Sequence, residues 1–199
     1  MKKEKSLIKF QDTLFRFKEH TIYNQNLHSI SLFPYANNMM RSKIFRIILN
    51  FSFYDINFNK KKALPFFLAL ELLTNQKCIA TLSSKNILSL KLRKGMLVGC
   101  KVTLRNDNLF DFFDSLSLTL PRQEKLNYLS LNKIKKSKTN FLFFKLTELV
   151  LFYPIELGLG INSEVKKIDI NFIFNCFSYE EKLFLLTSNK LPVLNKILY

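Results

Sequence analysis

The stretch Lys91–Arg105 alternates between apolar and polar side chains along its second half, and this pattern constrains the fold more than any other in the chain. Side chains of a β-strand point alternately to its two faces, so an extended chain has one apolar and one polar side here. The apolar side carries Cys100, Val102 and Leu104, and the polar side carries Lys101, Thr103 and Arg105. One side can pack on a core, while the other offers cations and a hydroxyl to a phosphate-rich partner.

Gly95 and Gly99, two of only four glycines in the chain, bracket Met96–Val98 just before this alternation. Glycine adopts backbone conformations that other residues avoid, and its lack of a side chain lets another backbone come close. We therefore expect a turn or a close backbone approach at this point.

The net charge is +16, from 31 Lys and Arg against 15 Asp and Glu. Such an excess goes beyond what solubility requires and is typical of proteins that bind polyanions, because each neutralised phosphate releases counterions. Hydrophobic residues make up 48% of the 199 residues, which is ample for one core and argues against wholesale disorder. The chain has 21 Phe, no Trp and 4 Gly, a skew that indicates an A/T-biased genome such as that of an organelle.

No pattern in the sequence indicates catalysis. The Gly-rich nucleotide loops, the paired-histidine zinc motif and the nucleophile elbow are absent, and the helical pair Asp111 and Asp114 is better explained as a solvated face. The three cysteines, Cys78, Cys100 and Cys176, have no zinc-site spacing and fit buried free thiols in a reducing compartment. We therefore expect no enzyme activity, no cofactor and no metal.

The remaining periodicities predict an α+β fold, an antiparallel sheet with helices packed on one face. The predicted strands are Lys43–Phe53, Cys78–Leu82, Val98–Arg105, Phe141–Phe152 and Lys166–Phe174. The predicted helices are Lys60–Leu73, with Pro65 marking its first turn, a helix before Pro121 with the stripe Leu109, Phe112, Phe113 and Leu116, and a last helix that opens with the capping box of Ser178 and Glu181.

Residues 1–40 are basic and irregular, and we interpret them as an N-terminal arm before a single domain of residues 41–199. A helical spacing is present in the arm at Leu7, Phe10, Leu14 and Phe17, whereas Asn24–Asn38 is predicted to be a loop. The Lys-rich segment 125–140 is predicted to be a second loop. The longest apolar run, Phe141–Gly160, contains charged residues and a proline, so we expect no membrane partner.

Several short segments match segments of a known protein family and occur in the same order along the chain. They are Leu49-Asn50, Leu73–Lys77 (LTNQK), Gly99–Arg105 (GCKVTLR), Leu120–Arg122 (LPR), Phe152–Pro154 (FYP), Ile168–Ile170 (IDI) and Ser178–Glu181 (SYEE). Together they resemble large-subunit ribosomal protein five, the family that binds 5S ribosomal RNA in the central protuberance. The resemblance runs from about Lys43 to Leu194 and is strongest over Lys91–Arg122.

The resemblance implies a single α+β domain without catalysis, a structural constituent of the large ribosomal subunit. Members of the family contact 5S ribosomal RNA with an Asn, a Gln and a Thr, which match Asn50, Gln76 and Thr103 here. To this ribosomal-RNA contact we assign the basic residues Lys77, Lys101, Arg105 and Arg122 as well.

The family also has a protruding loop that approaches the transfer RNA in the peptidyl site, and this loop matches Ser84–Lys94. Its candidate contact residues are Ser84, Lys85, Asn86, Lys91, Arg93 and Lys94. We expect the loop to project from the body and to be poorly ordered in the isolated protein. Other partners implied by the resemblance are small-subunit protein thirteen, through an intersubunit bridge, and other proteins of the central protuberance.

With its A/T-biased composition, the chain resembles an organelle-encoded member. We expect it in the mitochondrial ribosome in the matrix, with a plastid or a bacterial cytoplasm as alternatives. A different class of function is a non-structural RNA-binding factor for ribosome assembly or maturation. A structural protein should stay with the large subunit in high salt, whereas such a factor should wash off.

Overall fold

The computed structural model describes residues 18–53, 60–120, 129–130, 140–146, 149, 152, 155, 167–189, 191 and 193–194. The chain forms two compact units. The first unit consists of Met1–Arg46, Arg105–Leu142 and Ile173–Tyr199, and the second of Ile47–Leu104 and Phe143–Phe172. The helix expected around Leu7–Phe17 and the loop expected over most of 125–140 lie outside the described residues.

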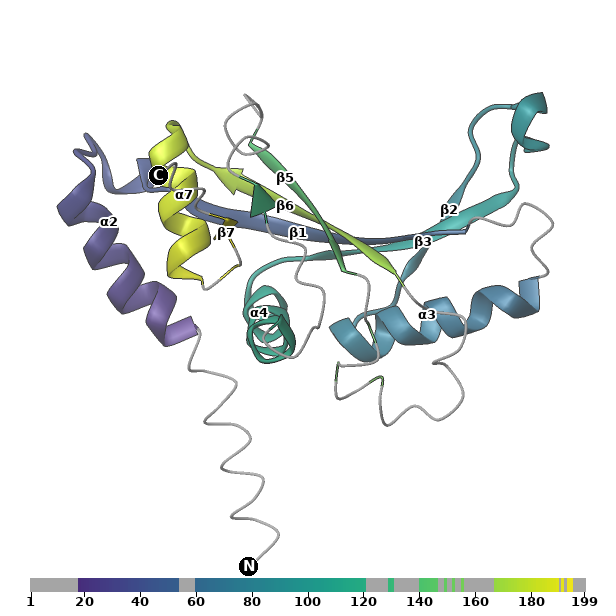
Figure 1. Cartoon of the computed structure of the whole chain (residues 1–199), viewed down its shortest axis with the longest axis horizontal. Coiled ribbons are helices and arrows are strands. Elements are labelled where there is room, and N and C mark those ends of the chain that lie inside the picture. Colours follow the sequence, from purple (N-terminus) through teal and green to yellow (C-terminus); the bar gives the residue numbers. More distant parts are fainter. Residues whose placement is uncertain are drawn as a thin grey trace, which may run out of the picture. The chain divides into compact units, whose positions relative to one another are not determined.

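Five strands form an antiparallel sheet in the order β2-β3-β1-β6-β5 (Figure 1). The strands are β1 (Lys43–Ser52), β2 (Ile79–Leu82), β3 (Leu97–Leu104), β5 (Phe141–Leu146) and β6 (Ile168–Asn175). Two short strands, β4 (Leu129–Ser130) and β7 (Val193–Leu194), pair in parallel as a separate sheet. The α+β prediction is therefore confirmed, and each predicted strand has a counterpart in the sheet.

The helical segments include several that the sequence did not predict. They are η1 (His20–Gln25), α2 (Asn26–Leu32), η2 (Asn38–Met40), α3 (Lys60–Thr74), η3 (Leu88–Leu90), α4 (Asp107–Thr119) and α7 (Tyr179–Ser188). The prediction that Asn24–Asn38 is a loop is wrong for Asn24–Leu32, which belongs to η1 and α2. The buried residue of α2 is the polar Ser29, while Leu27 and Ile30 are exposed, so the helix has no apolar stripe to reveal it.

Pro65 lies inside α3, which begins at Lys60, so the prediction that Pro65 marks the first turn is wrong. Proline in a helix interior loses a backbone hydrogen bond and disfavours the helix. Burial of Ala69, Leu70 and Leu73 opposes this loss, because the helix packs its apolar side against the sheet.

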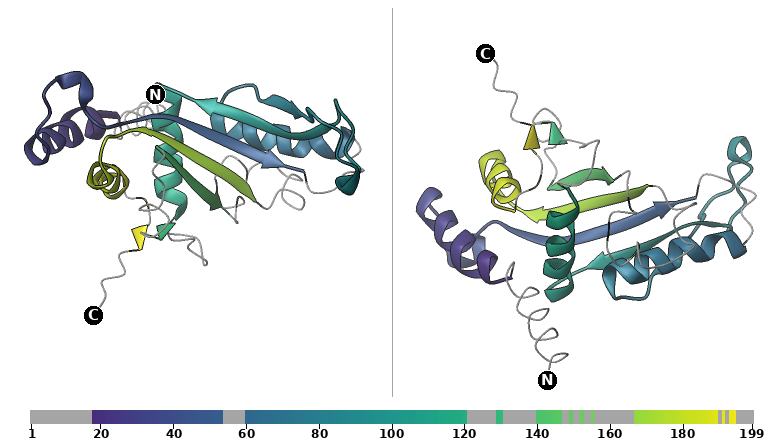
Figure 2. Two further views of the ribbon diagram at one scale, coloured as in Figure 1. Left: turned by 90° about the horizontal axis from the view of Figure 1, so that it is seen from above. Right: turned by 60° about the horizontal axis from the view of Figure 1, so that its bottom comes forward.

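In the second unit, α3 packs against β3 and lies along one face of the β2–β3 end of the sheet (Figures 1 and 2). The buried side of β1 consists of Ile47, Leu49 and Phe51, and that of β3 consists of Cys100, Val102 and Leu104. The Phe51 ring meets Phe66 of α3 edge-on, with 5.5 Å between the ring centroids. The apolar side predicted for the strand up to Arg105 is confirmed, whereas Phe45, on the same side of β1 as Ile47, is 54% exposed.

In the first unit, the predicted stripe of α4 is confirmed, since Leu109, Phe112, Phe113 and Leu116 are all buried. The predicted capping box of α7 is present in altered form. The Glu181 N–H donates to Ser178 Oγ at 3.2 Å, while the Glu181 carboxylate accepts from the Phe177 N–H at 3.0 Å rather than from Ser178. None of the described helices has the length and apolar character needed to cross a membrane.

Candidate nucleic-acid interface

The register of the second unit brings polar residues of β1 and β3 together in what we call the polar row, Asn50 and Lys101 with Thr103 beside them. Asn50 of β1 lies opposite Lys101 of β3, and Lys101 also lies opposite Ile79 of β2 on its other side. In the next row, Thr103 lies opposite Ile48 of β1. Residues directly opposite each other project from the same face, so these five side chains share the face that points away from the buried side of the sheet.

This face is open to a ligand. Lys101 is exposed, and Asn50 and Thr103 are half-buried. Within the described part of the chain, no hydrogen bond joins these three side chains to another residue. An amide, an ammonium group and a hydroxyl thus lie together with free donors, and all three can bind phosphate, ribose or backbone atoms of a nucleic acid.

Gly99 brings β1 and β3 close together beside this row. A Cβ atom at Gly99 would collide with the backbone carbonyl of Phe51 and would lie 3.0 Å from Thr81 Oγ1. Gly99 also lies opposite Ser52 of β1 and Thr81 of β2, so two hydroxyl residues flank the space that its missing side chain leaves. The expected close approach is confirmed, and Gly95, at φ +85°, supplies the expected turn.

Gln76 and Lys77 lie in the connection between α3 and β2. Asn75, at φ 51°, ends the helix in a left-handed conformation, and the Gln76 N–H then donates to Thr74 Oγ1 at 3.4 Å. Gln76 is half-buried and Lys77 is exposed. If the β2–β3 register continued by two residues, Lys77 would lie opposite Thr103, at the edge of the polar row.

The structure therefore brings three of the predicted ribosomal-RNA contacts together, namely Asn50, Lys101 and Thr103, and places Gln76 and Lys77 at the entrance to β2. Arg105 is exposed immediately after β3 and belongs to the first unit, while Arg122 lies outside the described residues. Sequence reasoning did not assign a binding role to Ser52 and Thr81. Ser52 could have been found by its spacing of two from Asn50, whereas Thr81 needed the β2–β3 register.

The candidate loop Ser84–Lys94 forms most of a hairpin that extends beyond the ends of β2 and β3 (Figures 1 and 2). Its tip is η3, where Leu88 is 93% exposed. Six predicted contact residues of this loop are exposed, namely Ser84, Lys85, Asn86, Lys91, Arg93 and Lys94. The prediction of a projecting surface loop is confirmed.

Hydrogen bonds within the hairpin hold its backbone. Ile87 and Leu92 exchange a pair of backbone hydrogen bonds at 2.9 and 3.0 Å. The Lys94 N–H donates to Asn86 Oδ1 at 2.6 Å, and Lys91 turns the chain at φ 54°. The hairpin thus carries four exposed cations on a backbone that is held by hydrogen bonds. That it is poorly ordered in the isolated protein stays a prediction.

The cysteines of the second unit contribute to packing rather than to chemistry at this face. Burial raises the pKa of the Cys100 thiol to about 12, with a smaller effect from Cys78 nearby. Burial, together with the Glu71 carboxylate, raises the pKa of Cys78 to about 11. Both thiols therefore stay protonated near neutral pH, and no group of three His, Cys, Asp or Glu among the described residues is placed to hold a metal.

The chain matches no protein-family model, but it is similar in sequence to known proteins over most of its length. The chain is 32% identical over 182 residues to the large ribosomal subunit protein uL5m of Reclinomonas americana, covering 91% of this chain and 98% of the relative. It is also 32% identical over 161 residues to the large ribosomal subunit protein uL5 of Wolbachia pipientis wMel, covering 80% of this chain and 89% of the relative. With this identity over nearly the full length of both relatives, the chain belongs to the uL5 family.

Proposed function

We propose that this chain is a structural protein of the large ribosomal subunit and that it binds ribosomal RNA through the open face of β2, β3 and β1. The observation that carries the proposal is the row of Asn50 and Lys101, with Thr103 beside it. These side chains are exposed or half-buried, project from one face and have donors free for phosphate and ribose.

The charge of the chain supports this function. A net charge of +16 favours association with a polyanion, and no acidic residue interrupts Lys91–Arg105. The relatives carry the names of ribosomal proteins, not of enzymes. The described residues likewise offer no cluster for a metal-dependent reaction.

The RNA that best fits this face is 5S ribosomal RNA, or the large-subunit RNA that occupies its place. The projecting hairpin Ser84–Lys94 then approaches the transfer RNA of the peptidyl site, since its four cations are exposed on a hairpin that extends beyond the ends of β2 and β3. Small-subunit protein thirteen and the other central-protuberance proteins are the protein partners of the same arrangement. The likeness to uL5m and the A/T-biased composition support a mitochondrial ribosome.

The test is the salt dependence of binding to a 5S ribosomal RNA transcript. We expect Lys101→Glu to weaken binding and to lower the slope of log affinity against log salt by about one unit, because one phosphate contact is lost. Lys167→Glu is the matched control, since Lys167 is exposed and lies outside the row. Equal affinities and slopes for the two variants would remove this face from the interface.

Asn50→Ala and Thr103→Val test the uncharged part of the contact. Each should weaken binding without a change in the salt slope, because each removes a hydrogen bond rather than a charge. Sedimentation distinguishes the structural role from the alternative of an assembly or maturation factor. We expect the protein to remain with large subunits through a high-salt wash, and its release into the supernatant would favour the factor.

A further inference from the structure

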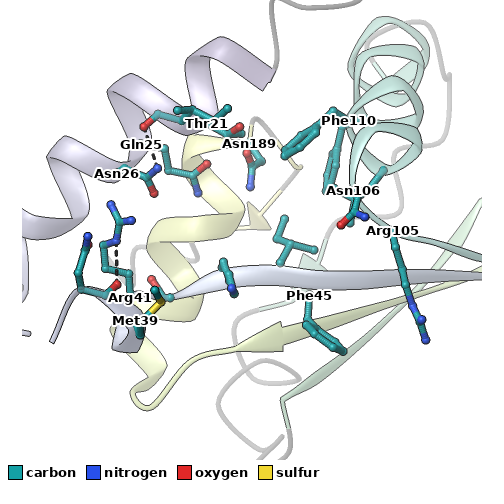
Figure 3. A pocket seen from close by; sticks show the side chains of 17 residues that line it. Thr21, Gln25, Asn26, Met39, Arg41, Phe45, Arg105, Asn106, Phe110 and Asn189 are labelled. Atoms are coloured by element: carbon teal, nitrogen blue, oxygen red, sulfur yellow. Dashed lines mark hydrogen bonds between the residues drawn. The ribbon is translucent and has the colours of Figure 1, made fainter.

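A cavity of about 410 Å³ lies within the first unit, among η1, α2, the start of β1, α4 and the end of α7 (Figure 3). Its size falls in the range of small-molecule sites in proteins. The residues that line it come from four separate parts of the sequence, 21–26, 38–45, 105–113 and 189. Its walls differ in chemistry, and these differences determine what can bind there.

The inner wall carries two buried amides. Asn189 is 2% exposed, and its Nδ2 donates to the Leu185 carbonyl at 2.7 Å. Its other amide atom, Oδ1, is buried without a hydrogen-bond partner among the described residues. Gln25 of η1, 7% exposed, lines the same wall (Figure 3). A buried acceptor without a partner is unfavourable. Because Asn189 lines the cavity, a turn of its amide toward a ligand that donates a hydrogen bond would relieve this cost.

The wall formed by α4 is aromatic. Phe113 is 1% exposed and belongs to the core, whereas Phe110 is only half-buried and lines the cavity one turn away. A partly exposed ring beside buried amides can stack on a flat heterocycle while the amides bind to its polar edge.

The rim of the cavity is basic. Arg41, Lys43 and Arg105 line it, and none of the described lining residues is acidic. The Arg41 Nε donates to the Asn38 carbonyl at 3.1 Å, which fixes the guanidinium and leaves its terminal nitrogens for a ligand. Arg105, already assigned to the ribosomal-RNA contact, is exposed at this rim.

We propose that this cavity holds one unstacked nucleotide of a single-stranded stretch of RNA, with the base against Phe110 and Asn189 and the phosphate at Arg41 and Lys43. The proposal rests on the RNA binding proposed above, which supplies the strand. It assigns a second contact, in the other compact unit, that differs in kind from the sheet face. The sheet offers small polar groups for a backbone, whereas this site encloses a base.

Other ligands fit this arrangement less well. A purely apolar ligand would leave the Asn189 acceptor unpaired and would place apolar surface beside three cations. An RNA duplex cannot enter, because its bases are paired and stacked. An acidic peptide would suit the rim, but it would offer no flat ring for Phe110.

The test compares binding of a short fluorescent oligoadenylate and a short RNA duplex to the full-length protein by fluorescence anisotropy. We expect Phe110→Leu to weaken oligoadenylate binding about tenfold, because stacking on an aromatic side chain is lost, and to leave duplex binding unchanged. Asn189→Leu should have the same selective effect. The matched control is Phe141→Leu, the same substitution at a residue that is 53% exposed in β5 and outside the cavity.

The outcomes separate this proposal from the proposed function. If Phe110→Leu and Phe141→Leu bind oligoadenylate equally well, the cavity holds no base, and ribosomal-RNA binding by the sheet is unaffected. A wild-type protein that binds neither RNA would overturn both proposals. If oligoglutamate binds the wild type and Phe110→Leu weakens that binding but not the binding of oligoadenylate, the cavity accepts an acidic peptide and the nucleotide proposal is wrong.

Discussion

Replacing Gly99 by Ala tests the close approach of β1 and β3, which positions Asn50 beside Lys101 in the polar row. The added Cβ would collide with the Phe51 carbonyl, a backbone atom of the neighbouring strand, and would lie 3.0 Å from Thr81 Oγ1. The Thr81 side chain can rotate away. The Phe51 carbonyl cannot, because Phe51 is paired with Cys100 in the ladder, so the two strands must separate locally.

The size of the effect follows from opposing contributions. Overpacking of this kind costs about 1–3 kcal/mol, and the local separation weakens backbone hydrogen bonds worth about 1 kcal/mol each. Replacing glycine by alanine in a strand recovers about 0.5–1 kcal/mol. We therefore expect Gly99→Ala to lower the free energy of unfolding by about 2 kcal/mol, which for a chain of this length lowers the Tm by roughly 4–8 °C.

Urea unfolding followed by circular dichroism gives this free energy, and Gly95→Ala is the matched control. A Cβ at Gly95 meets nothing within 4 Å, but the residue has φ +85°, so we expect only the conformational cost of about 1–2 kcal/mol. The Gly99 variant should also lose affinity for RNA, because separation of β1 from β3 moves Asn50 away from Lys101. A Gly99→Ala protein as stable as the wild type would refute the register on which the interface depends.

Three further substitutions test other parts of the structure. Cys100→Ser should cost roughly 1–3 kcal/mol in urea unfolding, because an unpaired hydroxyl replaces a buried thiol. Because burial raises the folded-state pKa of Cys100 from 9.0 to about 12, its contribution is complete below pH 9 and is lost as the pH rises toward 12. The serine variant should lose less stability over this range than the wild type, with Cys78 still contributing, and equal losses for the two proteins would contradict the assignment. Ser178→Ala should lower the free energy of unfolding by about 1 kcal/mol through loss of the α7 cap, and an unchanged Tm would show that the Glu181 carboxylate alone is sufficient. Asn86→Ala should speed hydrogen exchange at the Lys94 amide, measured by NMR, without changing global stability, whereas unchanged exchange would mean that the hairpin does not depend on this bond.

The part of the fold that sequence predicted correctly depends on strict periodicity. The alternation in Lys43–Phe53 and in the strand up to Arg105 assigned the two faces of β1 and β3 because a period of two does not depend on the rest of the fold. The buried stripe of α4 was found from the helical period of 3.6 residues, which likewise does not depend on the rest of the fold. The alternation placed Lys101 and Thr103 on the polar side of one strand and Asn50 on that of another, but the β1–β3 register was needed to show that the three share one face.

The parts that sequence did not predict depend on tertiary contacts. Helix α2 buries the polar Ser29 and exposes Leu27, so its pattern resembles a loop. Strands β4 and β7 have two residues each, too few for any periodicity. The cavity is built from four distant parts of the chain. Asn189 could not be identified as a ligand-binding residue from the sequence, because the argument depends on the missing hydrogen-bond partner of its Oδ1 among the described residues.

Among the described residues, three other than glycine have positive φ, and all three are of types that the composition of this chain favours. They are Asn75, Lys91 and Asn106, at φ 51°, 54° and 52°, and each occupies a conformation that glycine adopts at little cost. Asn and Lys have A-rich codons, while glycine codons begin with two guanines, and the chain has only 4 glycines. The cost of this conformation is about 1–2 kcal/mol for an ordinary residue and smaller for asparagine, so it falls chiefly on Lys91. Lys91→Gly should therefore stabilise the hairpin backbone, although it removes one of the four exposed cations.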